Sequence, residues 1–204
     1  MKLYFAPMTC SLSPHIVLRE LGLPFDLIRV NNQTKRTADA QDFMTINPKG
    51  YVAALVLDSG EVLTEGAVIV QYLADLVPGN SLAPANGSWQ RVRLQEWLNY
   101  ITAEIHSGCA PLFNRDLPEP TQRWFKQKLF KRLDYLSQTL AHQHYLMGSY
   151  GLADIYLFTV LGWLPFFGID LHHWPLLAAY RERIAARPSV KLALAAEAAS
   201  AAVG

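Results

Sequence analysis

The sequence is poor in cysteine and has no dominant charge, and both features exclude classes of protein. Only two cysteines occur in 204 residues. Cys10 and Cys109 lie far apart in the chain, which indicates neither a disulfide framework nor a cysteine-based zinc cluster. Because 18 basic and 17 acidic residues leave a formal net charge of +1, bulk charge does not favour nucleic acid or an anionic membrane. The six histidines lack the spacing of metal ligands, and we expect no metal.

The chain also lacks the signals of export and of membrane insertion. The first residues, 1–7, do not have the length or pattern of a signal peptide, so we expect a cytoplasmic protein. One apolar run, 152–169, approaches the length of a membrane span. It contains Asp154 near its start and Pro165 within it, which favours a helix buried in a protein core.

The composition and the order of the expected elements indicate two small domains. Hydrophobic residues make up 51% of the chain, enough for a sizeable core. The first eighty residues read as β-α-β, an irregular segment over 31–42, and then β-β-α. This order is typical of a thioredoxin-like mixed sheet. The expected elements are strands at 2–6, 25–30, 53–57 and 61–63 and helices at 11–20 and 65–76.

The composition changes after residue 77. Residues 78–88 are rich in Pro, Gly, Asn and Ser, which indicates a linker. Everything beyond the linker reads as helical, and the tail, 192–203, is expected to add a terminal turn or to fray. We therefore predict a thioredoxin-like domain over 1–77, a linker over 78–88 and an all-helical domain over 89–204. The expected helices of that domain are 89–109, 118–141, 152–164 and 176–187.

Cys10 falls between the first strand and the first helix. Amides at a helix N-terminus stabilise anions, so they favour a thiolate at this position. A buried, inert cysteine is the alternative, and the residues themselves leave the two interpretations open. Cys109, near the end of a helix, is interpreted as structural.

Two further positions suit an anionic or zwitterionic ligand. Gly66 places no side chain over the first amides of the helix that begins there, and Glu65 adds a carboxylate beside them. Together they suit an amino-acid-like group. The simpler interpretation is a plain helix start, with Thr64 as its cap. Lys35, in the polar segment, is either a partner for a carboxylate or a solvated surface lysine.

Asn99 and His106 stand seven residues apart in the long helix predicted at 89–109. This spacing drifts by only about 20° around a helix, so it leaves both side chains on one face. Such a face either lines a cleft or is a solvated stripe.

Taken in order, these stretches resemble the cytosolic glutathione transferases, in particular the bacterial beta class. The resemblance extends over nearly the whole chain and does not depend on one motif. Its densest parts are Cys-Ser-Leu-Ser-Pro-His-Ile-Val-Leu-Arg-Glu at 10–20, Phe-Met-Thr-Ile-Asn-Pro-Lys-Gly at 43–50, the helix start at 63–75, Glu-Trp-Leu-Asn-Tyr-Ile at 96–101 and Ala-Asp-Ile-Tyr-Leu-Phe-Thr-Val-Leu at 153–161.

The resemblance implies a glutathione S-transferase that joins the glutathione thiolate to hydrophobic electrophiles and acts as a homodimer. Glutathione would be a co-substrate, and no separate cofactor is implied. Cys10 would lie near the glutathione sulfur, and His106 would act beside it. Lys35 would pair with the glycine carboxylate, and the strand edge at Tyr51 and Val52 would hold the cysteinyl part by main-chain hydrogen bonds. Glu65 and Gly66 would hold the γ-glutamyl end, and Asn99, Ala103, Glu104 and Ile105 would complete the site, partly across the dimer interface.

The chain departs from the family pattern at several positions. Proline, with a cis peptide bond, normally follows Val52, and this chain has Ala53. Because a cis bond before a residue other than proline costs about 2.5–4 kcal/mol, we expect a trans bond, a relaxed corner and weakened glutathione binding. The other departures are Tyr51 for glutamine, Met8 for glycine, Ala103 for a polar residue and Gly151 for the Ser or Thr that caps the helix near 152.

Three functions follow from these observations. The first is glutathione conjugation, with peroxidase activity as a possible accompaniment. The second is a transferase-like binding or regulatory protein with weakened glutathione affinity, which Ala53 and Tyr51 favour. The third is glutathione-dependent thiol exchange, which requires Cys10 to be exposed and ionised. The sequence does not define the electrophile.

Overall fold

A computed structural model describes residues 1–201 of the chain. Contacts divide these residues into two compact units. The first comprises Met1–Asn80 together with the described residues from Ala186 onward, and the second comprises Ser81–Ala185. The division after Asn80 falls within the predicted linker. The predicted helical domain, by contrast, included residues that pack with the first unit.

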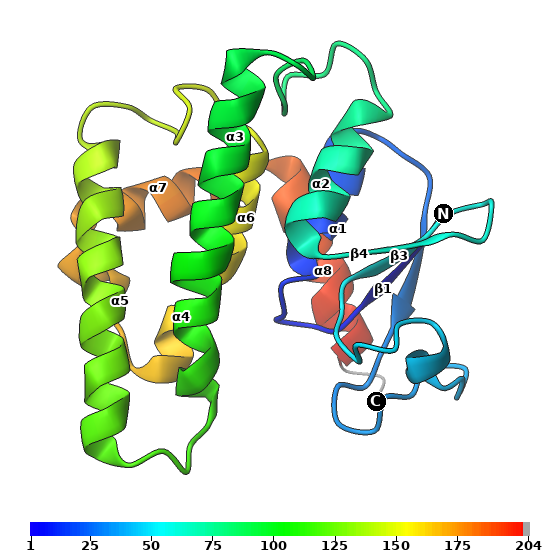
Figure 1. The fold of residues 1–204 in the computed structure, drawn as a ribbon, viewed down its shortest axis with the longest axis horizontal. Coiled ribbons are helices and arrows are strands. Elements are labelled where there is room, and N and C mark those ends of the chain that lie inside the picture. Colours follow the sequence, from blue (N-terminus) through cyan, green and yellow to red (C-terminus); the bar gives the residue numbers. More distant parts are fainter. Residues whose placement is uncertain (202–204) are drawn as a thin grey trace. The chain divides into compact units, whose positions relative to one another are not determined.

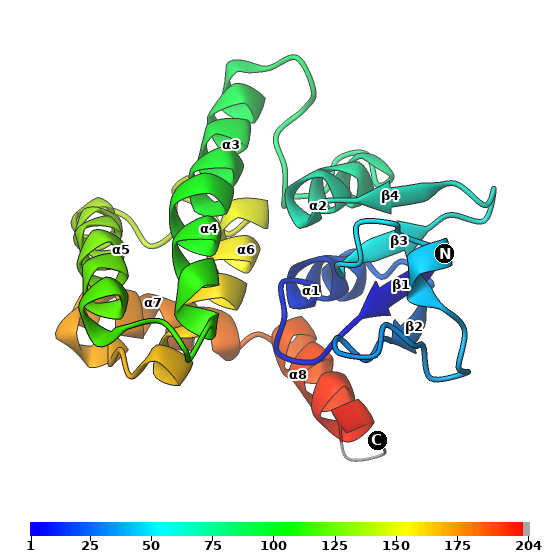
Figure 2. The same cartoon turned by 60° about the horizontal axis from the view of Figure 1, so that its bottom comes forward.

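The first unit is built on a four-stranded mixed sheet in the order β2-β1-β3-β4 (Figure 1). Strand β1 runs parallel to β2 and antiparallel to β3, and β3 pairs antiparallel with β4. Figures 1 and 2 show α1 and α2 over the same face of the sheet. This is the predicted thioredoxin-like arrangement. Its elements are β1 (Lys2–Phe5), α1 (Leu12–Glu20), β2 (Asp26–Arg29), a 3-10 helix (Phe43–Thr45), β3 (Ala54–Val56), β4 (Val62–Thr64) and α2 (Gly66–Asp75).

Both faces of this sheet are covered. Along β1 the side chains alternate between faces, as the pleat requires. Phe5 meets the ring of His15 on α1, with ring centroids 6.3 Å apart. Tyr4 contacts Phe43 from the segment between β2 and β3, at 5.8 Å. Val52 belongs to the same buried cluster as Tyr4 and Phe43, so the sheet core reaches directly to the predicted glutathione edge.

The C-terminal segment forms a helix, α8 (Pro188–Ala201), that belongs to the first unit. The expectation of a terminal turn or frayed tail is therefore wrong over its described part, and Ala202 and Val203 lie outside the described residues. The helix predicted over 176–187 ends at Ala185, and Pro188 begins α8, where its missing N–H costs nothing. Figure 2 shows α8 beside α1.

Two side-chain pairs attach α8, and the residue before it, to the first unit. His15 Nδ1 lies 3.0 Å from Glu197 Oε1, and both side chains are buried. Arg187 donates from Nε to Glu20 Oε1 at 2.7 Å. These contacts join the helix to α1 by partners that are 182 and 167 residues apart in sequence.

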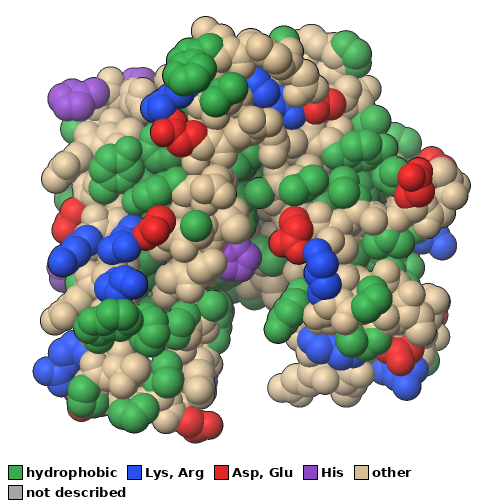
Figure 3. Space-filling model, in the orientation of Figure 1, with side chains coloured by type: hydrophobic (Ala, Val, Ile, Leu, Met, Phe, Trp, Pro, Cys, Tyr) green, Lys and Arg blue, Asp and Glu red, His purple; other side chains and the backbone are tan. Residues whose placement is uncertain are grey.

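The second unit is helical, as predicted. Its central helix, α6, has all ten residues buried, which is what an apolar surface on every side of a helix requires. Figure 3 shows Lys and Arg side chains among hydrophobic ones over α5. Within residues 1–201, none of the helices is both long and apolar enough to cross a membrane. The elements are α3 (Trp89–Tyr100), α4 (Ser107–Cys109), α5 (Glu119–Leu140), α6 (Leu152–Leu161), α7 (Pro175–Ala185) and short 3-10 helices at 110–113, 164–167 and 171–173.

The long helix predicted over 89–109 is interrupted. Ile101–His106 form a π-helical segment between α3 and α4. The face shared by Asn99 and His106 was predicted for a continuous α-helix, and the wider π turn changes the angular spacing of residues after Tyr100. The prediction of one uniform helix is therefore wrong at the segment that carries the expected site residues Ala103, Glu104, Ile105 and His106.

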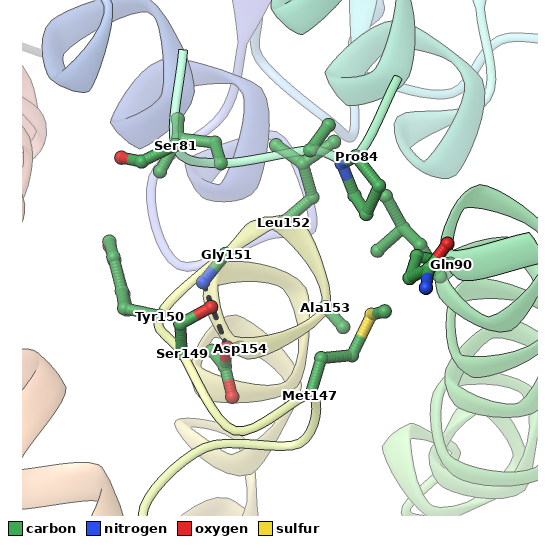
Figure 4. A pocket seen from close by; sticks show the side chains of 13 residues that line it. Ser81, Pro84, Gln90, Met147, Ser149, Tyr150, Gly151, Leu152, Ala153 and Asp154 are labelled. Carbon is green, nitrogen blue, oxygen red and sulfur yellow. Dashed lines mark hydrogen bonds between the residues drawn. The ribbon is translucent and has the colours of Figure 1, made fainter. Parts of the chain in front are cut away.

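Gly151 occupies the start of α6 for a steric reason (Figure 4). A Cβ atom at this position would lie 2.7 Å from the carbonyl oxygen of Leu82, which also accepts from Leu152 N at 3.0 Å. Asp154 Oδ2 accepts from Gly151 N at 2.9 Å, so the carboxylate half of the capping arrangement persists. The glycine that replaces the usual Ser or Thr thus gives the segment at Leu82 room to bond to the helix.

Candidate glutathione site

The corner between Val52 and Ala53 contains a cis peptide bond. Our expectation of a trans bond is therefore wrong, and the weakened binding inferred from a relaxed corner loses its basis. Hydrogen bonds hold the carbonyl groups on this corner. Asn47 donates from Nδ2 to Tyr51 O at 2.7 Å, and Cys10 Sγ donates to Val52 O at 3.2 Å. The side chains of Val52 and Ala53 are buried, whereas Tyr51 is 74% exposed.

Cys10 is half-buried at the turn before α1. Burial raises the pKa of its thiol to about 11, hydrogen bonds from the backbone of Ala53 and Cys10 lower that pKa by less, and the charge of Glu65 raises it further. Of the two interpretations that the sequence left open, the thiolate is therefore not favoured, because desolvation outweighs the amide hydrogen bonds. Cys10 acts here as a neutral donor to Val52.

The loop that carries Cys10 is shaped by Met8 and Ser11. Met8 has a φ of 64°, a left-handed conformation that glycine adopts without a Cβ penalty, which explains why glycine suits this position. Ser11 directs its hydroxyl to the backbone of Ala6, accepting from Ala6 N at 3.2 Å. Cys10 is thus presented by a turn that its own neighbours hold.

Lys35 is not a freely solvated lysine. Its ammonium group donates to Gly50 O at 2.8 Å and lies 5.6 Å from the ring centroid of Tyr51. The structure therefore brings Lys35 to the predicted edge, next to Tyr51. Tyrosine in place of the usual glutamine provides an aromatic face over which this cation rests.

Glu65 and Gly66 lie at the start of α2, as predicted, and Lys49 joins them. Glu65 adopts a φ of 69°, and its carboxylate accepts from Lys49 Nζ at 2.7 Å. The interpretation of Thr64 as the cap is wrong, because Glu65 occupies the N-cap position and its side chain does not cap α2. The Thr64 hydroxyl instead accepts from Lys49 Nζ at 3.0 Å. A Cβ on Gly66 would meet Ser13 Oγ at 3.7 Å, an ordinary contact. The Lys49 ammonium thus occupies the position beside the Glu65 carboxylate.

The remaining predicted residues belong to the second unit. Asn99 is exposed in the last turn of α3, and Ala103 is exposed on the π-helical segment. Ile105 is fully buried, so its side chain cannot contact a ligand. Among the five residues predicted between 99 and 106, Glu104 and His106 have polar side chains with defined partners.

Glu104 is paired with Arg132 of α5. Arg132 donates from Nε and Nη2 to Glu104 Oε2 at 2.8 and 2.7 Å. Both side chains are partly exposed, so the pair fixes the direction of the carboxylate more than it adds to stability. Arg132 lies on the helix predicted at 118–141, but its register against Glu104 depends on the fold.

His106 ends the π-helical segment and is held by aromatic side chains. Its Nδ1 lies 2.7 Å from the hydroxyl of Tyr156 on α6. Its ring packs edge-on to Trp163, with centroids 4.9 Å apart. Lys49, Arg132 and Tyr156 were missed from sequence, although Lys49 and Tyr156 stand within stretches already recognised at 43–50 and 153–161.

No group of three or more His, Cys, Asp or Glu side chains within residues 1–201 is arranged to hold a metal ion. The first unit instead offers an exposed strand corner, a lysine and a carboxylate at a helix start, and the second unit carries His106. The order of a thioredoxin-like unit and then a helical unit is the one that the resembled class of transferases leads us to expect.

Comparison with known proteins identifies the family within that class. The family model described as "Glutathione S-transferase, N-terminal domain" matches residues 7–76, and that described as "Glutathione S-transferase, C-terminal domain" matches residues 100–188. Glutathione S-transferase GstA of Escherichia coli O157:H7 is 44% identical over 198 residues, which cover 97% of this chain and 98% of that protein. The chain belongs to the glutathione S-transferase family.

Two solved structures support this relationship. A sphingomonad glutathione S-transferase complexed with glutathione is 42% identical, with a TM-score of 0.94, and the match covers 97% of this chain and 99% of that one. The bacterial beta class glutathione S-transferase of Sphingomonas chungbukensis is also 42% identical, with a TM-score of 0.93, covering 97% and 98%. The resemblance to the bacterial beta class is thus confirmed.

Proposed function

We propose that this protein is a glutathione S-transferase that transfers the sulfur of glutathione to hydrophobic electrophiles. The observation that carries the proposal is its relationship, over nearly the full length of both chains, to glutathione S-transferases. A free thiol with a pKa of about 8.5 is only about 3% ionised at pH 7. Stabilising the thiolate of bound glutathione is therefore the main chemical task of the site.

The first unit supplies the groups for three parts of glutathione. Lys35 would pair with the glycine carboxylate. The main chain of Val52 would bond to the cysteinyl part. The Val52 carbonyl, which accepts from the Cys10 thiol in this structure, would then accept from the ligand's amide. Glu65 would bind the γ-glutamyl amino group in place of Lys49, and the open start of α2 at Gly66 would receive the carboxylate.

The second unit would complete the site with Asn99, Ala103, Glu104 and His106, in part from the other subunit of a homodimer. Ile105 would contribute only its backbone, because its side chain is fully buried. Homodimerisation and a cytoplasmic location are the further parts of the proposal. Sedimentation of the purified protein at micromolar concentration tests the dimer.

The alternative function as a binding protein with weakened affinity depended on a relaxed corner at Ala53. Since the Val52–Ala53 bond is cis and the chain's relatives are named as transferases, we do not propose it. Thiol exchange through an ionised Cys10 is also disfavoured, because burial raises the pKa of this thiol to about 11.

Steady-state conjugation with a panel of model electrophiles tests the proposed activity. We expect glutathione-dependent product with at least one aromatic halide. Lys35→Met and Glu65→Gln should raise the KM for glutathione by about tenfold, since each removes one hydrogen bond to a charged group. Lys131→Met, which removes an exposed cation on α5, is the control. Product formed at the same rate without the enzyme, across the whole panel, would refute the proposal.

A further inference from the structure

Lys49 places a cation at the start of α2, beside the predicted glutathione edge. Its ammonium group donates to Glu65 Oε1 at 2.7 Å and to Thr64 Oγ1 at 3.0 Å. The side chains of Lys49 and Glu65 are 55% and 62% exposed. An ion pair with this exposure adds little to stability. Both groups are therefore accessible to a ligand, and either can change partners at low cost.

The backbone of Lys49 is held in place, whereas its side chain is exposed. Asn47 Oδ1 accepts from Lys49 N at 3.2 Å, and the Asn47 carbonyl accepts from Gly50 N at 2.9 Å. Asn47 itself is buried, so this turn fixes the point from which the lysine stem begins. A flexible four-carbon stem then allows the ammonium group to exchange acceptors around the start of α2.

The charges beside the start of α2 match those of an α-amino acid. Glu65 provides a carboxylate for an ammonium group, and Lys49 provides an ammonium group for a carboxylate. Within residues 1–201, no other lysine or arginine is paired with Glu65. Because Gly66 has no side chain, the helix itself offers a carboxylate only main-chain amides. Electrostatic complementarity to a zwitterion therefore favours a contribution from the Lys49 cation, which also offsets the repulsion between Glu65 and the ligand's carboxylate.

We propose that Lys49 is a glutathione-binding residue that exchanges partners when the ligand enters. This inference deepens the proposed function and rests on it. In the free protein the Lys49 ammonium is paired with Glu65. In the complex the ligand's ammonium group takes its place on the Glu65 carboxylate, and Lys49 turns to the α-carboxylate of the γ-glutamyl group. One ion pair is broken and two are formed, with no proton transferred and no covalent bond made.

Binding calorimetry with two ligands tests this exchange. The first ligand is glutathione, and the second is γ-aminobutyryl-cysteinylglycine, in which a hydrogen atom replaces the α-carboxylate. Lys49→Met should weaken the binding of glutathione by about fivefold, because the carboxylate loses an exposed ion pair. The same substitution should tighten the binding of the second ligand by about threefold, because Glu65 is released from Lys49 and no ligand carboxylate loses a partner. The sign of the effect thus depends on one group of the ligand.

Two further variants control for charge and for folding. Lys49→Arg retains the cation and should bind glutathione within about twofold of wild type. Lys2→Met removes an exposed lysine of the same unit and should leave the affinity for both ligands unchanged. Lys2 pairs with Val56 at one end of the sheet, whereas Thr64 pairs with Ala54 toward the other. Lys49→Met should unfold at the same urea concentration as wild type, because the ion pair that it removes is exposed.

Three results would overturn the exchange while the wild-type protein still binds glutathione. Tighter binding of glutathione by Lys49→Met would show that Lys49 only competes for Glu65. An unchanged affinity for both ligands would show that Lys49 takes no part in binding. Equal weakening of both ligands would assign it a structural role in the turn. Absence of glutathione binding by the folded wild-type protein would refute the proposed function, and the role of Lys49 with it.

Discussion

The thiol of Cys10 donates a hydrogen bond to the carbonyl oxygen of Val52 across 3.2 Å. This single contact joins the turn before α1 to the cis corner that we expect glutathione to meet. We expect the cysteine and the strand edge to respond together when glutathione binds, because the ligand's amide would share this carbonyl with the thiol or take its place. The thiol is retained in its neutral form, because burial raises its pKa to about 11.

Alkylation of Cys10 tests this account of the thiol. With a pKa of about 11, only about 0.1% of the thiol is ionised near pH 8. The rate of modification by iodoacetamide, followed by peptide mass spectrometry, should rise about tenfold per pH unit between pH ~6 and ~9. The urea-unfolded protein is the control, in which Cys10 should titrate at its ordinary pKa. A plateau below pH ~7.5 in the native protein would show an activated thiolate instead.

Substitution of Glu197 tests the attachment of α8. Glu197→Ala leaves His15 Nδ1 without its carboxylate partner in a buried position, and an unsatisfied buried group costs about 1–3 kcal/mol. We expect urea denaturation to show a loss of unfolding free energy in that range. Glu182→Ala removes an exposed carboxylate of α7 and should change stability by less than about 0.5 kcal/mol. Equal stabilities for the two variants would contradict the packing of α8.

Gly151→Ser distinguishes helix capping from steric fit. A hydroxyl at this position would restore the usual cap, worth only a few tenths of a kcal/mol over glycine. The new Cβ, however, would lie 2.7 Å from Leu82 O, a clash with backbone that we expect to cost about 1–3 kcal/mol. Thermal unfolding should therefore show a less stable variant.

The control for Gly151→Ser is Gly108→Ala in α4. A Cβ at Gly108 would meet Leu129 Cδ1 at 4.0 Å, so it fits, and alanine should stabilise the helix by about 0.5–1 kcal/mol. A Gly151→Ser protein more stable than wild type would show that the cap dominates and that the segment at Leu82 moves easily.

Asp154 gives the second unit a specific dependence on pH. Burial raises the pKa of this carboxyl to about 6, against opposing hydrogen bonds from Leu146, Tyr180 and Gly151. The native state thus binds a proton more readily than the unfolded state. Stability from this group is fully present below the unfolded pKa of 3.8 and is lost as pH rises through about 6.

Asp154→Asn removes the titration. When the pH is raised from ~4.5 to ~7.5, the unfolding free energy of wild type should fall by about 2 kcal/mol relative to that of the variant. Urea titrations of both proteins at the two pH values measure it. A difference that is constant with pH, or that grows in favour of wild type as pH rises, would contradict a raised pKa.

The sequence predicted most elements of the first unit because its turn signals and short apolar runs are local. Turn residues separate elements of clear hydrophobic period. They are Gly22 with Pro24, and the run Asn47-Pro48-Lys49-Gly50. The helix α8 was not predicted because its partners lie in α1, far away in the sequence. A local sequence pattern cannot show that Glu197 is buried against His15. Pro188 is compatible with the end of one helix and with the start of the next.

The sequence predicted which residues form the candidate site, but not their hydrogen-bond partners or their protonation states. The positions of Lys35, Glu65 and Gly66 followed from the family pattern, whereas the contacts of Lys49 with Glu65 and of Arg132 with Glu104 depend on folded geometry. The π-helical turn at 101–106 leaves no local signature that separates it from an α-helix. The state of Cys10 could not be inferred, because desolvation depends on the surrounding residues and opposes the helix amides.

Calorimetric titration with glutathione tests the central claim most directly, because it measures binding without requiring the right electrophile. We predict saturable binding of glutathione, and of an analogue in which a methyl group replaces the thiol, with Glu65→Gln and Lys35→Met each weakening both ligands by about tenfold. Binding of the analogue separates the peptide contacts from the sulfur chemistry. If millimolar glutathione produces no heat of binding in the folded wild-type protein, the proposed transferase function is contradicted.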